Sequence, residues 1–309
     1  MLPSPPVLRR LAVANLVANV LIVLTGGAVR LTASGLGCPT WPRCTETSLV
    51  TTRELGVHGY VEFGNRLLTF ALAAVAVATV VAAVTTRARR DVRLLSLAVL
   101  LGIPLQAVIG GITVLTDLNP WVVMLHFLAS MVLIAVATVL VHRTRGDAVP
   151  YAAVPPAARR LAWAVAATLA AVLYVGAVVT GSGPHAGDLD ARRTGLDPGV
   201  LAQVHADLVF LLVGLTVGLL VTLQAVRAPH AVRRAAAVLL AAELAQGVVG
   251  YVQYALALPR GLVAVHMVGA ALLVVAATSL TVVMTAGARP PAPASPPLPR
   301  ARPAREVTG

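Results

Sequence analysis

The residues with the clearest potential for chemistry lie in one short stretch, His58-Gly-Tyr-Val-Glu62-Phe-Gly-Asn65-Arg66, which opens a long apolar run. At about 100° per residue, its four polar side chains fall within roughly 100° of one another around a helix, so they share one face. Polar groups are costly in lipid, and this face is therefore expected to point into a bundle interior and to mark a site. Glu62 could shuttle protons or stabilise a cationic intermediate, and it could also be a structural partner of Arg66.

The stretch belongs to an internal repeat. A shift of 140 residues places His126 on His266. The same shift places Gln106-Ala-Val-Ile-Gly110 on Gln246-Gly-Val-Val-Gly250 without a gap, and the two glutamines are expected to hydrogen-bond between helices. One offset held through about 70 residues indicates two copies of one four-helix unit.

Four of the seven histidines lie near the same end of their apolar runs, namely His58, His126, His205 and His266. At 1.5 Å per residue, all four fall within roughly 10 Å of one membrane surface. A single buried histidine usually has a structural role, whereas two pairs related by a repeat favour metal coordination. Histidines on facing helices suit a haem iron, which takes axial ligands from two sides, while zinc would need three or four ligands close together. His142 and His230 lie beside arginines and are expected to be solvated loop residues.

The two halves are not identical. The shift places Asn65 on His205 and Glu62 on Ala202. The second half is therefore predicted to be a plain bis-histidine haem site, formed by His205 and His266 with no carboxylate beside them. The first half is predicted to act on a haem, where Arg66 could pair with a propionate or simply extend toward the membrane surface.

These side chains must be positioned inside a membrane protein. The chain has 309 residues, of which 58% are hydrophobic, and its mean hydropathy is +0.86. Charged residues make up 12%, against about 25% in a typical soluble protein. The net charge of +12 comes from 24 arginines and no lysine. These arginines lie in short connections between apolar runs, which indicates membrane topology rather than a nucleic-acid surface.

Eight apolar runs are long enough to span a bilayer, so we predict an all-α integral membrane fold of two pseudo-symmetric four-helix bundles. Alternate connections carry 17 arginines on one side and 6 on the other, which predicts that both termini are cytoplasmic. The first run could be a signal peptide, but its counterpart in the second half is a full span. The predicted units are residues 1–145, residues 146–285 and a disordered cytoplasmic tail, 286–309. The spans lie at about 9–29, 57–85, 94–116, 120–141, 161–181, 200–226, 235–257 and 262–285.

Both cysteines lie in one outer connection, Cys38-Pro-Thr-Trp41-Pro-Arg-Cys44. The predicted topology places them outside the cytoplasm, where disulfides persist, so we predict that Cys38 and Cys44 are bonded to each other. A bond between them would close only a short loop, so its effect on stability should be modest. An exposed bond in a small ring is also more easily reduced, which leaves a redox role open.

Several of these motifs, taken in order on a duplicated eight-helix frame, resemble the haem A synthases over about residues 10–285. They are Gly26-Gly-Ala-Val-Arg30-Leu-Thr-Ala-Ser34-Gly, the Cys38…Trp41-Pro…Cys44 loop, Glu62-Phe-Gly-Asn65-Arg66 and the histidines 126, 205 and 266.

The resemblance implies oxidation of the C8 methyl of haem O to the formyl group of haem A, for terminal cytochrome oxidases. It implies a haem b cofactor held by His205 and His266, and substrate haem near His126 and Glu62. It also implies supply of haem O by a haem O synthase, an unidentified electron donor, cytochrome oxidase as acceptor and a location in the cell membrane with the haem sites near the outer face. A homo-oligomer is left open, and no nucleic-acid partner is expected.

One position departs from the family. Many members carry Glu-x-x-His in the second helix, whereas this chain has Asn65 three residues after Glu62. His58 lies one turn before Glu62 on the same face and could replace the missing ligand, or His126 could hold a five-coordinate substrate iron alone. Two other functions fit parts of the pattern: a b-type cytochrome that only passes electrons, and a transporter built on the duplicated frame.

Overall fold

A computed structural model gives the fold and describes residues 6–145 and 154–285. The predicted tail, 286–309, lies outside these residues. Within them, eight α-helices are long and apolar enough to cross a membrane, which confirms the predicted all-α fold of eight spans. A single 3-10 turn, η1 (Arg53–Leu55), precedes the second helix. The helices are α1 (Pro6–Leu31), α2 (Gly56–Thr85), α3 (Arg90–Leu115), α4 (Pro120–Thr144), α5 (Pro156–Ser182), α6 (Pro198–Ala225), α7 (His230–Ala255) and α8 (Arg260–Thr285).

Local sequence signals set several helix starts. Proline begins α4 and α6, where its missing N–H would have no helical partner. The residue before each proline caps the helix: Asn119 Oδ1 accepts from Trp121 N at 3.0 Å, and Asp197 Oδ1 accepts from Gly199 N at 2.7 Å. These caps fix the starts of the two helices that carry His126 and His205.

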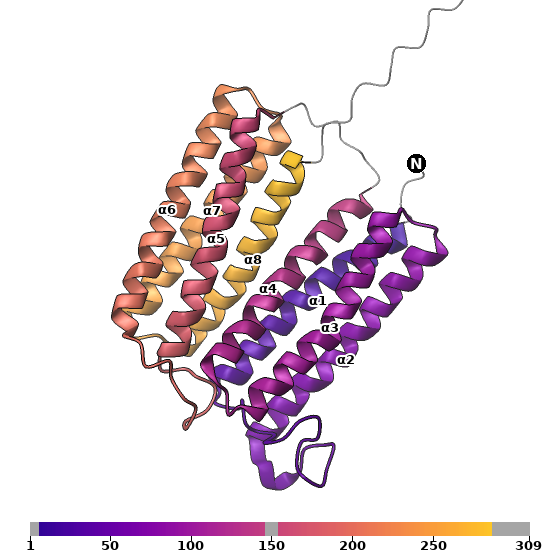
Figure 1. The fold of residues 1–309 in the computed structure, drawn as a ribbon, viewed down its shortest axis with the longest axis vertical. Helices are drawn as coiled ribbons and strands as arrows, with labels where there is room; N and C mark the ends of the chain where they lie inside the picture. Colours follow the sequence, from indigo (N-terminus) through magenta and orange to yellow (C-terminus); the bar gives the residue numbers. More distant parts are fainter. Residues whose placement is uncertain (1–5, 146–153, 286–309) are drawn as a thin grey trace, which may run out of the picture.

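The helices form two groups of four that lie side by side, α1–α4 and α5–α8 (Figure 1). In each group, consecutive helices pack together and the first also packs on the fourth. Contacts between the groups are made by α1 and α4 on one side and α5 and α8 on the other. A buried cluster from α1, α4 and α8 fills this junction: Val23, Met131, Ile134, Ala271 and Val274.

Helix bounds also repeat along the chain. The bounds of α3 recur 140 residues later in α7, and the start of α4 recurs in α8. Two residues with positive φ follow α3, Asp117 and Leu118, and two follow α7, Ala257 and Leu258. The same turn therefore closes both helix pairs. The symmetry of the two bundles as whole bodies stays a prediction.

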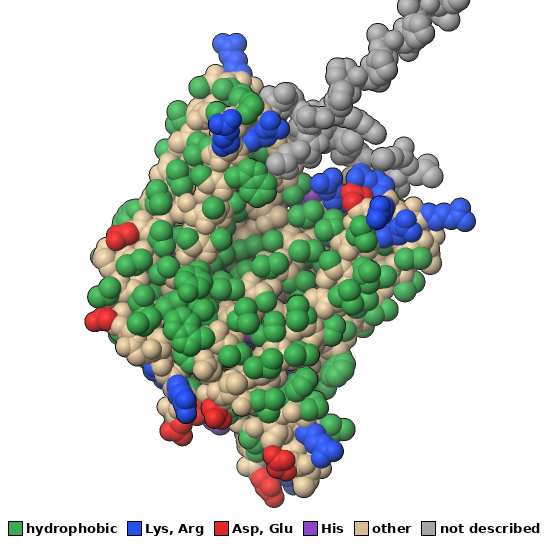
Figure 2. Space-filling view, viewed as in Figure 1, with side chains coloured by type: hydrophobic (Ala, Val, Ile, Leu, Met, Phe, Trp, Pro, Cys, Tyr) green, Lys and Arg blue, Asp and Glu red, His purple; other side chains and the backbone are tan. Residues whose placement is uncertain are grey.

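The surface divides along the helix axes. Figure 2 shows apolar side chains over the middle of the visible face and charged side chains mostly toward its two ends. Arginines predominate at the end where α1 begins, and acidic side chains gather at the other. We call the latter the outer end, which bears the connections 32–55, 116–119, 183–197 and 256–259. That it faces away from the cytoplasm stays a prediction.

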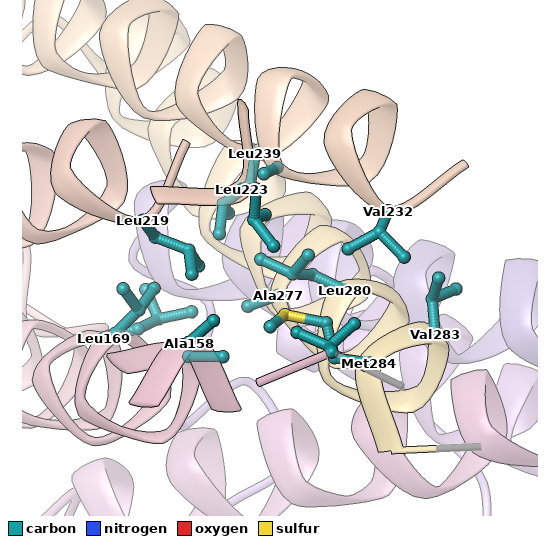
Figure 3. Close-up of a cluster of buried hydrophobic side chains, with 14 of the residues drawn as sticks. Ala158, Leu169, Leu219, Leu223, Val232, Leu239, Ala277, Leu280, Val283 and Met284 are labelled. Atoms are coloured by element: carbon teal, nitrogen blue, oxygen red, sulfur yellow. The ribbon is translucent and has the colours of Figure 1, made fainter. Parts of the chain in front are cut away.

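The core of the second bundle lies away from that outer end. Figure 3 shows Leu219 and Leu223 of α6 packed toward Leu239 of α7 and Leu280 of α8. These four side chains are at most 1% exposed. The dense packing fixes the helices at one end, while the predicted histidines lie nearer the other end of the same helices.

Candidate functional site

Three predicted histidines share one environment. His126 and His266 are each the seventh residue of their helices, and His205 is the eighth of α6. Each ring lies against a glycine of a neighbouring helix, where a Cβ would come within 3.2 Å of the ring atom Cε1. The pairs are Gly110 with His126, Gly176 with His205 and Gly250 with His266. Glycine is therefore what leaves room for each imidazole.

The rings of the two histidines of the second half lie close together, in an edge-to-face arrangement. The ring centroids of His205 and His266 are 6.5 Å apart, with an angle of 71° between the ring planes. Two metal–nitrogen bonds of about 2 Å, together with the two ring radii, span roughly 6 Å. The separation is close to the one expected for two axial ligands of one iron.

All three rings also contain an unsatisfied atom. The Nδ1 atoms of His126, His205 and His266 are buried and have no hydrogen-bond partner. The His205 ring faces the main chain of Val172 without a hydrogen bond of normal geometry. Such atoms are uncommon in native folds and call for an explanation, and a bound group is one.

The available donors suit haem better than a bare metal ion. Among the described residues, no three His, Cys, Asp or Glu side chains converge in a way that could hold a metal ion. A haem brings four equatorial ligands of its own and asks the protein for one or two axial ones. A close histidine pair supplies that number.

Two glutamines donate hydrogen bonds to the main-chain carbonyls of two of these histidines. Gln106 Nε2 donates to the His126 carbonyl at 3.3 Å and to Ser130 Oγ at 2.5 Å. Gln246 Nε2 donates to the His266 carbonyl at 2.7 Å. The predicted role of both glutamines in hydrogen bonding between helices is confirmed.

Glu62 is buried beneath the cysteine loop. Its Oε2 accepts from Cys38 N at 2.7 Å, and its Oε1 forms an ion pair with Arg66 Nη2 at 2.5 Å. The Arg66 guanidinium also donates to the carbonyls of Cys38, Thr40 and Arg43. Arg66 is thus engaged by the protein on every nitrogen, and in this arrangement it acts as the structural partner of Glu62.

The cysteine loop is closed as predicted. Cys38 and Cys44 form a disulfide. The ring of Trp41, inside the loop, packs directly on Gly111 of α3. The loop therefore lies across the outer ends of α2 and α3, above Glu62.

His58 and Asn65 have separate surroundings. His58 is exposed, and its Nδ1 hydrogen-bonds Ser34 Oγ at 2.9 Å. Asn65 Oδ1 accepts from Thr25 Oγ1 of α1 at 2.7 Å. The four polar residues that open α2 therefore make different contacts, and only Glu62 and Arg66 meet directly. Iron ligation by His58 gains no support from this placement and stays a prediction.

Two features were missed from the sequence. Glu243 of α7 is 2% exposed; its Oε1 accepts from Thr216 Oγ1 at 2.9 Å, and its Oε2 has no partner. It lies one turn deeper than Gln246. A lone acidic residue in an apolar span was the signal in the sequence that could have identified it.

The expectation that His142 is a solvated loop residue was wrong. His142 lies on α4 and hydrogen-bonds Ser279 of α8 at 3.0 Å.

Eight helices of membrane-spanning length among the described residues define the class as polytopic membrane proteins. Residues 9–187 match the family model COX15-CtaA, described as cytochrome oxidase assembly protein. This match covers more than half of the chain, which therefore belongs to that family. His205 and His266 lie beyond the matched residues, so their assignment depends on the repeat and on their geometry.

The chain is also similar to curated proteins named heme A synthase. It is 33% identical over 112 residues to that of Geobacillus thermodenitrificans, which covers 36% of this chain and 34% of the relative. It is 33% identical over 138 residues to that of Lysinibacillus sphaericus, with 43% of each covered. For Geobacillus kaustophilus the identity is 32% over 107 residues, covering 34% and 33%. The chain thus spans less than half the length of these relatives.

Proposed function

We propose that this protein is a haem A synthase, an oxidoreductase that converts the C8 methyl of haem O to the formyl group of haem A. Its family membership and its similarity to proteins named heme A synthase support this. The observation that carries the proposal is the set of three histidine rings, each against a glycine and each with a buried, unpartnered Nδ1. They lie near the same helix ends as Glu62.

In this proposal the second half holds haem b through His205 and His266. A haem there would supply one-electron transfer. The chain's own contribution is to fix both rings, through the Gln246 bond to the His266 carbonyl and the close packing of Gly176 and Gly250.

The first half binds the substrate haem near His126. Conversion of a methyl to a formyl takes two successive two-electron oxidations, to the alcohol and then to the gem-diol, each of which adds one oxygen atom, and the gem-diol then loses water. The oxidant and the oxygen atoms come from outside the chain. Glu62 is the acid–base group placed for proton transfer, and Cys38 N and Arg66 hold its carboxylate in position. Asn65 leaves His126 as the predicted ligand of the substrate iron.

The proposal implies three partners: a haem O synthase as the source of substrate, an electron donor, and a cytochrome oxidase that accepts haem A. It places the protein in the cell membrane with both termini in the cytoplasm and the haem sites near the outer face. The arginine bias of the connections supports that orientation.

A second function is a b-type cytochrome that passes electrons and leaves haem O unchanged. The observation that favours it is Asn65, which hydrogen-bonds Thr25 where the family pattern has a histidine.

Haem extraction and mass analysis distinguish the two functions. The chain would be expressed with a haem O synthase in a host that lacks haem A. We expect haem A, or its hydroxylated intermediate, in the extract. Haem O left unconverted, in a host where a known family member converts it, would instead support the electron carrier.

The same experiment tests Glu62. Glu62→Gln keeps an oxygen that can accept from Cys38 N but removes the proton-transferring carboxylate, so product should fall about 100-fold or more. Glu46→Gln, an exposed change in the connection between α1 and α2, should leave product at the wild-type level. Equal yields from both variants would exclude Glu62 from the chemistry.

A further inference from the structure

A cavity of about 90 Å³ lies at the outer end, where the two halves meet. Its lining comes from the end of α1, the 183–197 connection and the start of α8, and includes the side chains of Arg30, Arg193 and Arg260. Asp188 also lines it. Among the described residues, none of the three arginines forms an ion pair with any carboxylate. Three guanidinium groups against one carboxylate give the cavity lining a net positive charge.

Two of these guanidinium groups are held in place by main-chain carbonyls. Arg30 Nη2 donates to the Thr180 carbonyl at 2.8 Å, and Arg30 Nε donates to the His185 carbonyl at 2.5 Å. Arg193 donates to the carbonyls of Pro184 and Ala191. Carbonyls position these groups but do not cancel their charge, and donors remain free for a ligand.

The cavity lies just outward of the second-half histidine pair. Thr180, which binds Arg30, is one turn beyond Gly176, the glycine that packs on His205; the step along α5 is about 6 Å. Arg260 precedes His266 by six residues on α8, which is about 9 Å along the axis.

Helix α1 also reaches this level. A Cβ at Gly27, one turn before Arg30, would lie 3.0 Å from Cε of Met267, the neighbour of His266. Arg30 thus comes from the first half and lies over the site of the second.

We infer that this cavity binds a propionate carboxylate of the haem held by His205 and His266, an inference that depends on the proposed haem site. A cavity of about 90 Å³ has room for a carboxylate group. Guanidinium groups bind carboxylates through paired, charge-assisted hydrogen bonds. Because Arg30 belongs to the first half, both halves hold this haem.

The test compares haem b with its dimethyl ester, which lacks the propionate charges. Full-length protein from a haem-deficient culture would be titrated with each compound and followed by absorbance. We expect wild type to bind the ester about tenfold more weakly than haem b. Arg260→Gln and Arg193→Gln should weaken haem b by about the same factor and leave the affinity for the ester unchanged.

Arg260 is the more informative position to substitute, because its side chain is exposed and makes no hydrogen bond among the described residues. Arg192→Gln is the matched control, since Arg192 is an exposed neighbour of Arg193 that does not line the cavity. Equal wild-type affinity for the two compounds overturns the inference. So does a cavity variant that loses haem b and ester alike, or native mass spectra in which Arg260→Gln loses only a bound anionic phospholipid.

A wrong assignment of the haem ligands would give a different result in the same titrations. His205→Ala and His266→Ala should abolish tight binding of both haem b and the ester. If they bind as wild type does, the ligand assignment is wrong, whatever the ester result.

Discussion

At the scale of single residues, each histidine of the site depends on a glycine of the neighbouring helix. A Cβ at Gly176 would lie 2.8 Å from Cε1 of His205, closer than packed carbon atoms approach. The ring would have to turn away from its partner, His266. The glycines are thus part of the site, although they supply no ligand.

Gly176→Ala should therefore lower the haem b retained per purified protein several-fold. The measurement is a pyridine haemochrome assay on protein extracted under identical conditions. Gly218→Ala on α6 is the control, because a Cβ there meets nothing within 4 Å. Full haem content in Gly176→Ala would show that the His205 ring does not need its present position.

The sequence could predict the histidines because the 140-residue repeat superimposes His126 on His266, and His205 lies at a similar depth in its own apolar run. Glu243 has no such signal, since the position 140 residues earlier is Ile103. Its partner, Thr216, lies on another helix, and that pairing depends on how α6 and α7 pack. A repeat therefore identifies residues that both halves share, but it gives no signal for a residue that is present in one half only.

At the scale of elements, the cysteine loop and α2 form one hydrogen-bonded unit. Glu62 accepts from Cys38 N, and Arg66 donates to three loop carbonyls. The disulfide restricts the loop that provides these groups. The geometry of Glu62 is therefore coupled to the state of the cysteines.

Replacing both cysteines, Cys38→Ser with Cys44→Ser, should loosen this unit. Amide hydrogen exchange across residues 37–48 should become about tenfold or more faster, because local opening no longer has to work against the ring. Peptides from the 183–197 connection serve as the internal control and should not change. Unchanged exchange in 37–48 would mean that the contacts to Glu62 and Arg66 hold the loop without the disulfide.

Helix positions were predictable from hydropathy, but helix ends less so. The run predicted at 120–141 continues through Thr144, and the run predicted at 9–29 begins at Pro6. Hydropathy falls at the first polar residues, whereas backbone hydrogen bonds carry each of these helices about one turn further. The contact between Glu62 and the loop was beyond prediction, because it depends on the path of a long irregular connection.

At the scale of the whole molecule, more of the described arginines lie at one end of the helices than at the other (Figure 2). The connections at the end where α1 begins carry most of them, which predicts that this end is cytoplasmic. The haem sites would then lie near the outer face.

Alkaline phosphatase fusions test this orientation, because the enzyme is active only outside the cytoplasm. A fusion after residue 194, in the connection between α5 and α6, should be active. A fusion after residue 228, between α6 and α7, should be inactive. The reverse pattern would place the histidines near the cytoplasmic face and contradict the proposed topology.

The proposed function gives the two halves different roles, although they share a buried junction. In the proposed function, the second half holds a resident haem b through His205 and His266, and the first half binds the haem that is changed. The family match covers α1 to α5, so the second-half site is the part that most needs a direct test.

The most direct measurement is the haem composition of the purified double variant, His205→Ala with His266→Ala, from a host that makes haem b and haem O. We predict that haem b is lost while haem O or its oxidised product remains bound, and that His142→Ala retains the wild-type composition. Haem b at the wild-type level in the double variant would contradict the account.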